Sequence, residues 1–213
     1  MTARYTLYGL FASGPTYKVG LMLTLCGEAF DYVHVNLREG AHKAPDYLAI
    51  NRFGQVPALV DNGNGQALCQ SGAILDYLAD KTGKFGGATL QDRLRAREWL
   101  FWGWDKFDAP VYRLRSWKLG FRSFEPAVVE LYGAERKAAF DTLEQFFSAG
   151  HDYLAGDHAT IADIDLYGVA ALAHQGDYDV SVHPHVVKWM KRIEALPHFK
   201  SPETLLPHES RKA

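Results

Sequence analysis

The sequence predicts an α/β domain followed by an all-helical domain. Short β-prone stretches alternate with helix-like stretches up to residue 82, whereas no strand-like alternation is found from residue 90 onwards. Between them, residues 83–89 (GKFGGAT) are rich in glycine, which is typical of a linker. We therefore expect one domain over residues 1–82 and a second over residues 90–213.

A strand, a helix and a second strand are expected at the start of the first domain. Residues 4–10 (RYTLYGL) alternate and are β-prone, so they predict a strand. Helical spacing over Thr16–Leu25 predicts a helix, which Gly27 ends. Residues 30–36 (FDYVHVN) predict a second strand, and a short helix is expected over residues 46–50 after a polar loop.

A hairpin and a helix complete this domain. Residues 57–60 and 66–69 predict two strands, which the turn-forming sequence NGNG at 62–65 joins. Ser71 is expected to cap a helix that ends at Gly83. The resulting order, β-α-β-α-β-β-α, is that of a thioredoxin-like domain whose sheet is covered by helices.

The second domain is expected to be helical throughout. Apolar residues recur at near-helical spacing from Leu90 to Val111, which predicts a helix with Phe101 and Trp104 in the core. Pro110 is expected to kink or end this helix. Further helices are expected over residues 126–150, 160–173 and 186–195.

Two small motifs in the second half have structural interpretations. Thr160 and Asp163 match a capping box at the start of a helix, which stabilises folding and has no catalytic role. His183 and His185 flank a proline, but no cysteine or acid stands at ligand spacing from them. We interpret them as part of a turn and expect no metal.

Composition limits the classes of function. The net charge of −2 indicates neither a nucleic-acid surface nor a polybasic membrane patch. The sequence has no apolar run near the ~20 residues needed to span a bilayer and no apolar core of a signal peptide at its start. It has two cysteines and no CxxC motif, which fits a reducing cytoplasm and argues against a dithiol oxidoreductase.

The stretch Asn51–Val60 (NRFGQVPALV) predicts a binding site for a short peptide. Pro57 stands at the start of an apolar run, where its missing N–H is tolerated and where a cis bond to Val56 is expected. The backbone of Val56 is then free to pair with a ligand. Ser71 opens the next helix, whose N-terminal N–H groups can hold an anion. This combination favours a peptide that carries a carboxylate.

Over its whole length the chain resembles the cytosolic-type glutathione S-transferases. The resemblance rests on LYGLFASGPTYKVGLML (7–23), GAHKAPDYLAINRFGQVPALVD (40–61), LCQSGAILDYLAD (68–80), ATIADIDLYG (159–168) and HPHVVKWMKRIEALPHF (183–199). It implies that the first domain binds glutathione as co-substrate and that the helical domain supplies a pocket for a small apolar electrophile. It also implies a homodimer.

The resemblance assigns roles to individual residues. Ser13 falls where serine-type members face the glutathione sulfur with a hydroxyl, which would donate a hydrogen bond to the thiolate. The implied glutathione contacts are His42, Lys43, Gln55, Val56, Pro57, Gln70 and Ser71. From the residues alone, a serine at position 13, before Gly14-Pro15, is most often just a turn residue. Ser71 can be only a helix cap, a role compatible with binding, and His42 and Lys43 can be solvated loop residues.

The electrophile pocket and the type of reaction remain open to alternatives. Phe11, Trp102, Tyr112 and Arg113 are the candidates for the pocket wall. Pro15-Thr16 stand where many bacterial members have Asn-Cys, which removes polar groups near the sulfur. The alternatives are another glutathione-dependent enzyme, such as a disulfide reductase or an isomerase, and a non-catalytic binding or assembly module.

Overall fold

A four-stranded mixed sheet organises the first part of the chain. The computed structural model describes residues 3–213. The strands are β1 (Tyr5–Gly9), β2 (Phe30–His34), β3 (Ala58–Asp61) and β4 (Gln66–Cys69). Their order is β2-β1-β3-β4, with β2 parallel to β1 and with β3 antiparallel to both β1 and β4. The predicted thioredoxin-like order is confirmed, because a helix returns the chain from β1 to the parallel β2.

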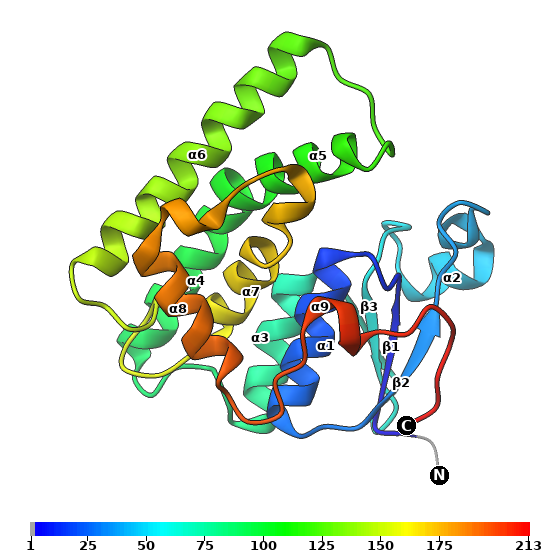
Figure 1. The fold of residues 1–213 in the computed structure, drawn as a ribbon. Coiled ribbons are helices and arrows are strands. Elements are labelled where there is room, and N and C mark those ends of the chain that lie inside the picture. Colours follow the sequence, from blue (N-terminus) through cyan, green and yellow to red (C-terminus); the bar gives the residue numbers. More distant parts are fainter. Residues whose placement is uncertain (1–2) are drawn as a thin grey trace. The chain divides into compact units, whose positions relative to one another are not determined.

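Helices cover both faces of this sheet. The helices of this part are α1 (Gly14–Cys26), α2 (Pro45–Ile50), α3 (Ser71–Thr82) and α9 (Pro202–Leu205), with a 3₁₀ turn η1 (Ala41–Lys43) before α2. Helices α1 and α3 lie side by side on one face, and α2 lies on the other (Figure 1). Under α2, a small apolar cluster forms around Val35, Tyr47 and Ala58. This cluster supports the loop that the sequence singled out.

The second part of the chain is helical, as predicted. Its α-helices are α4 (Leu90–Trp102), α5 (Ala109–Lys118), α6 (Pro126–Ser148), α7 (Ile161–Ala170) and α8 (Pro184–Glu194). Its irregular turns are η2 (Gly103–Asp108), η3 (Ala173–Gly176) and η4 (Val180–Val182). Pro110 was expected to kink or end a helix. It lies in the first turn of α5, and the helix is interrupted immediately before it by a π-helical turn, η2. Proline lacks the N–H that would continue the α-helical ladder.

The predicted core positions on α4 and η2 are wrong. The side chains of Phe101 and Trp104 are 76% and 39% exposed. The buried stripe instead runs through Ala96, Leu100, Gly103, Phe107 and Val111. A Cβ added at Gly103 would lie 2.9 Å from Leu166 of α7, so this glycine allows the two helices to approach closely. Small residues mark this helix contact, and a search for large apolar residues misses them.

Asp163 joins three segments of the helical part. Its carboxylate is fully buried and accepts hydrogen bonds from the backbone N–H of Thr160 (2.8 Å) and of Leu154 (2.9 Å). The Thr160 hydroxyl donates to it as well (3.0 Å), and so does Nε1 of Trp189 on α8 (2.9 Å). The capping pair predicted from sequence therefore also anchors a helix that is distant in the chain.

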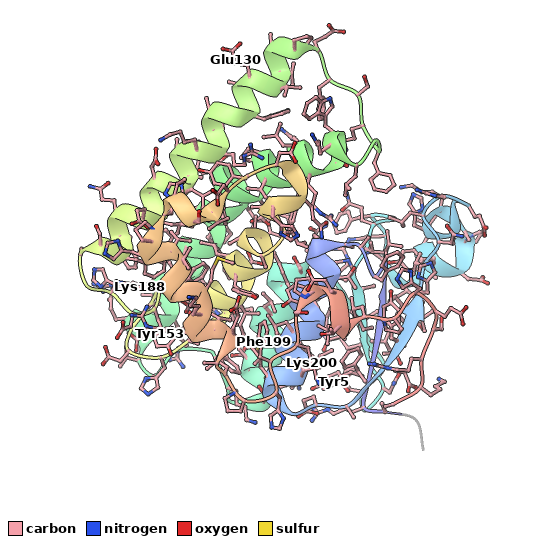
Figure 2. All side chains as sticks on the ribbon, in the orientation of Figure 1. Tyr5, Glu130, Tyr153, Lys188, Phe199 and Lys200 are labelled. Carbon is pink, nitrogen blue, oxygen red and sulfur yellow. The ribbon has the colours of Figure 1, made fainter. Side chains whose placement is uncertain are left out.

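The contacts divide the chain into two compact units. One unit comprises the chain up to Lys84 together with Leu196–Ala213, and the other comprises Phe85–Ala195. The sequence places residues 196–213 with the second domain, but these residues contact the first unit. Tyr17 donates its hydroxyl to the backbone carbonyl of Lys200 (2.9 Å), a residue on the segment that leads into α9 (Figure 2). Among residues 3–213, no helix is long and apolar enough to cross a membrane.

Candidate functional site

Ser13 caps the first helix with its side-chain oxygen, and its hydroxyl proton remains available for a second hydrogen bond. It has an extended backbone and precedes Gly14, and its Oγ accepts a hydrogen bond from the backbone N–H of Thr16 at 3.2 Å. The backbone N–H of Ser13 donates to the carbonyl of Leu10 (2.9 Å), which closes a tight turn between β1 and α1. Since Oγ is an acceptor toward the helix, its own O–H can donate away from the helix. The half-buried side chain therefore combines a hydrogen-bond donor with the positive end of a helix dipole.

Gly9 lets the start of α1 lie directly against β1. A Cβ added at Gly9 would lie 2.0 Å from Cγ2 and 2.8 Å from Oγ1 of Thr16, which is far closer than van der Waals contact. The backbone carbonyl of Gly9 also accepts hydrogen bonds from the N–H of Val35 (2.7 Å) and the hydroxyl of Tyr32 (3.2 Å). The end of β1 is thus fixed on both sides immediately before the turn that carries Ser13.

The loop before β3 is held by two buried side chains. The peptide bond from Val56 to Pro57 is cis, as the sequence predicts. The carbonyl oxygen of Gln55 accepts hydrogen bonds from the Tyr47 hydroxyl (2.6 Å) and from Nδ2 of Asn51 (2.7 Å), and Asn51 also reaches the carbonyl of Pro57 (3.3 Å). Burial raises the pKa of Tyr47 to about 12, so its hydroxyl stays a neutral donor. Val56 precedes the β3 ladder, which begins at Ala58.

Gln70 and Ser71 form the second side of this loop site. Nε2 of Gln70 donates to Oε1 of Gln55 at 3.3 Å, so two of the predicted contact residues meet. Gln70 has a positive φ of 73°, which is uncommon for a residue other than glycine and occurs at ligand-holding positions. It occupies the capping position of α3, and Ser71 is the first helical residue. The expectation that Ser71 caps this helix is therefore wrong.

Two polar atoms at the predicted site are buried without an internal partner. Ser71 is 1% exposed, and its Oγ has no hydrogen-bond partner within the described part of the chain. The same holds for Nδ1 of His42, which lies on η1. Buried polar atoms in folded proteins are nearly always paired, so such atoms indicate a place for a polar ligand group.

Lys43 ties η1 to the cis-proline loop. Its Nζ donates to the backbone carbonyl of Gly54 at 3.1 Å, and a Cβ added at Gly54 would lie 2.8 Å from the same Nζ. An ammonium group has three donors, so two N–H bonds of Lys43 remain for a carboxylate. The exposed Lys43 side chain is thereby held beside the loop instead of extending freely into solvent.

Comparisons with known proteins agree with this geometry. Residues 3–80 match the glutathione S-transferase N-terminal domain, and residues 125–197 match the glutathione S-transferase C-terminal domain. Glutathione S-transferase 3 of Zea mays is 33% identical over 211 residues, which cover 94% of each chain. The chain belongs to the glutathione S-transferase family.

Other glutathione S-transferase relatives extend the comparison. The disulfide-bond oxidoreductase YfcG of Escherichia coli (strain K12) is 28% identical and covers 88% of this chain and 89% of its own. The crystal structure of a glutathione S-transferase from Pseudomonas fluorescens Pf-5 matches with a TM-score of 0.88 at 29% identity, covering 94% of this chain and 99% of that chain. Relatives of this chain therefore carry the names of two different activities, a transferase and a disulfide-bond oxidoreductase.

The residues predicted to line the electrophile pocket do not lie together in one cleft. Trp102 is half-buried and lines a cleft of about 680 Å³ in the helical unit, together with Trp99 and Phe146. Tyr112 donates to the carbonyl of Gly168 (3.4 Å), and Arg113 donates to the Tyr132 hydroxyl (2.8 Å). Neither residue lines that cleft. Phe11 belongs to the other unit, where its ring lies 3.8 Å from that of His208.

The family resemblance did not identify the residues that hold the cis-proline loop before β3 and the start of α1 in place. Tyr47 and Asn51 shape the backbone around Pro57, and Gly9 sets the position of α1. Asn51 offered one signal: a polar residue that directly follows a short helix and precedes a cis-proline loop has backbone carbonyls within reach. No group of three or more metal-binding side chains occurs in the described range 3–213.

Proposed function

We propose that the protein is a glutathione transferase that stabilises the thiolate of glutathione and adds it to a small apolar electrophile. The observation that carries this proposal is the Ser13 hydroxyl, which caps α1 and retains a donor at the positive end of that helix. Membership of the glutathione S-transferase family supports the same reaction class. In this reaction the thiol loses its proton to solvent and the sulfur forms a new bond to an electrophilic carbon; with a chlorodinitrobenzene substrate, the C–Cl bond of that carbon breaks and chloride leaves.

The free energies available at Ser13 match what the reaction needs. A free thiol has a pKa near ~8.5, and lowering this value by ~2 units requires about 2.7 kcal/mol. A hydrogen bond from Ser13 to a charged sulfur contributes about 1.5–3 kcal/mol, and the dipole of α1 contributes about 0.3–1 kcal/mol. Ser13 thus acts as a hydrogen-bond donor to the thiolate, and no separate base is required.

We assign the tripeptide to the loop between η1, β3 and α3. The backbone of Val56 beside Pro57 pairs with the cysteinyl residue, as in strand addition. Gln55, Gln70 and the buried Ser71 hydroxyl receive the γ-glutamyl end, aided by the N-terminal N–H groups of α3. His42 and Lys43 receive the glycyl carboxylate. The unpaired atoms of Ser71 and His42 support this assignment.

The apolar electrophile is assigned to the cleft of the helical unit that Trp102 lines together with Trp99 and Phe146. Aromatic side chains suit this task because small-molecule sites are lined mainly by apolar groups with a few polar ones. Conjugation of such electrophiles fits a detoxifying role.

A homodimer forms part of the same proposal. Leu90, Leu94, Phe101 and Trp104 are 63%, 45%, 76% and 39% exposed on α4 and η2. Four large apolar side chains along one helical segment indicate a surface that a partner covers. We name these four residues the α4 apolar surface and assign it to a second copy of this chain.

Replacing Ser13 tests the proposed reaction. Ser13→Ala is expected to lower turnover of a chlorodinitrobenzene substrate by about 10- to 100-fold, since each 1.36 kcal/mol corresponds to a factor of ten. Glutathione binding, measured by calorimetry, should change little. Ser13→Thr is the matched control, because its hydroxyl keeps both the acceptor for Thr16 N–H and the donor to sulfur, and it should retain turnover. Wild-type turnover in Ser13→Ala would contradict the proposal.

Disulfide reduction is the second candidate, favoured by the similarity to YfcG. In that reaction glutathione attacks a disulfide and a second glutathione releases the thiol, so two glutathione molecules are oxidised to glutathione disulfide. An assay with hydroxyethyl disulfide distinguishes the two reactions. Disulfide reduction without conjugation would favour this candidate, and glutathione binding without either reaction would favour a binding module.

A further inference from the structure

The C-terminal segment, residues 207–213, lies along the outer edge of the sheet and pairs with β2 through a single β-bridge between Tyr32 and Arg211. The N–H of Tyr32 donates to the carbonyl of Arg211 (2.7 Å), and the N–H of Arg211 donates to the carbonyl of Tyr32 (2.8 Å). The backbone N–H of His34 donates to the hydroxyl of Ser210 (2.9 Å). Because β2 is the outer strand of the sheet, this segment pairs with an edge that would otherwise be open.

A buried carboxylate fixes the end of this segment. The side chain of Asp31 on β2 is 2% exposed and accepts hydrogen bonds from the N–H of Ala213 (2.9 Å) and from Nζ of Lys212 (2.9 Å). These two donors lower the pKa of Asp31. Residues 210–213 are therefore held beside β2 by the bridge at Arg211 and by the bonds of Ser210, Lys212 and Ala213.

His208, on the same C-terminal segment, lies against the turn that carries Ser13. The rings of His208 and Phe11 have centroids 3.8 Å apart with an interplanar angle of 34°. On the β2 side, the ring of His34 lies 6.2 Å from Phe11 at an angle of 22°. Phe11 is the first residue after Leu10 in the turn, and two imidazole rings contact its side chain, His34 of β2 and His208 of the C-terminal segment.

We infer that His208 is a positioning residue: it fixes Phe11, and through it the turn that holds the Ser13 hydroxyl. The turn spans only Leu10 to Ser13, so a change in the position of Phe11 is transmitted to Ser13 within two peptide units. Hydrogen-bond donors to a reacting atom must be held to within about 0.5 Å. The consequence for catalysis rests on the proposed conjugation reaction, whereas the positioning itself does not.

Amide exchange tests the positioning without an activity assay. The N–H of Ser13 is bonded to Leu10 O, and the N–H of Thr16 is bonded to Ser13 Oγ, so their exchange rates report opening of the turn. In His208→Ala we expect both amides to exchange roughly 3- to 10-fold faster, as loss of one ring pair predicts. His208→Phe keeps a ring on Phe11 and should restore the wild-type rates.

Kinetics and a control complete the experiment. His208→Ala should lower kcat for conjugation by a similar factor, leave KM for glutathione unchanged, and be rescued by His208→Phe. His158→Ala, an exposed histidine of the helical unit, should change none of these values. Unchanged Ser13 and Thr16 exchange in His208→Ala, or no rescue by phenylalanine, would overturn the inference. If the wild-type protein conjugates no electrophile, the proposed function fails, and the exchange rates still decide the role of His208.

Discussion

The two units differ in the kind of residue that determines their structure. In the unit built on the sheet, single residues with special backbone properties do so: the glycine at 9, the cis proline at 57 and the positive φ of Gln70. In the helical unit, the small residues Ala96 and Gly103 are buried on α4 and η2, whereas Phe101 and Trp104 of the same segment are exposed. Of these features, the cis bond before Pro57 could be predicted from the sequence, whereas the role of Gly9 and the burial pattern of α4 could not.

The largest effect is expected from Gly9→Ala, which tests the first half of this contrast. The new methyl group would overlap Thr16 at 2.0 Å, so α1 must move away from β1. We expect the free energy of unfolding to fall by about 3 kcal/mol or more, measured by urea denaturation.

Two further variants isolate the cause. Adding Thr16→Ala to Gly9→Ala removes both clashing atoms and should restore part of the stability. In the helical unit, Gly133→Ala on α6 meets no atom within 4 Å and should stabilise the protein by up to about 1 kcal/mol. Equal effects of the two glycine substitutions would remove the distinction between the units.

The second prediction concerns the α4 apolar surface. Leu94→Gln with Phe101→Asn should weaken self-association by at least tenfold, because burying each such side chain contributes about 1.5–3 kcal/mol. Sedimentation velocity over a concentration series measures the change. Leu131→Gln on α6, where the side chain is 55% exposed outside this surface, is the matched control. A wild-type protein that stays monomeric at high micromolar concentration would contradict the dimer.

The smallest effect is expected at Glu144. Burial raises its pKa, but hydrogen bonds from the His185 ring and from the backbone N–H groups of Val186 and His185 outweigh this, so the net pKa lies below its ordinary value. A lowered pKa in the folded state means stability that is present above about pH 4.5 and is lost as the pH falls through the folded value.

Unfolding measured at pH 7 and near pH 3.5 tests this. Glu144→Gln should lower the free energy of unfolding at pH 7 by about 1 kcal/mol, as loss of a helix cap does. It should also make the free energies of unfolding at the two pH values more similar. Glu130→Gln, at the exposed start of the same helix α6 (Figure 2), should leave both measurements unchanged. If the free energy of unfolding of both variants changes equally between the two pH values, Glu144 does not contribute to the pH dependence of stability.

Much of the fold could be predicted from sequence because its signals are local. The cis bond before Pro57 followed from a proline at a strand start, and β3 begins one residue later, at Ala58. The start of α1 was predicted at Thr16, two residues after its actual start at Gly14, because Pro15 lies inside its first turn, where proline is favoured. The exposure of Phe101 could not be predicted, since periodicity does not say whether an apolar face meets the chain itself or a partner.

The candidate site was accessible only in part. Gln55 and Gln70 were predicted individually, and the structure shows that their side chains meet. Asn51 and Tyr47 were not assigned roles, because their importance arises from a carbonyl oxygen that both share, which is a property of the folded loop. The contact between Phe11 and His208 joins residues nearly two hundred positions apart, which no local pattern records.

The shared carboxylate of Asp163 has a consequence for how the helical unit opens. Donors from Leu154, Thr160 and Trp189 meet on one group, so the loop before α7, the start of α7 and the middle of α8 lose their common anchor together. These three segments should therefore behave as one cooperative block in native-state fluctuations, released in a single event and not frayed piece by piece.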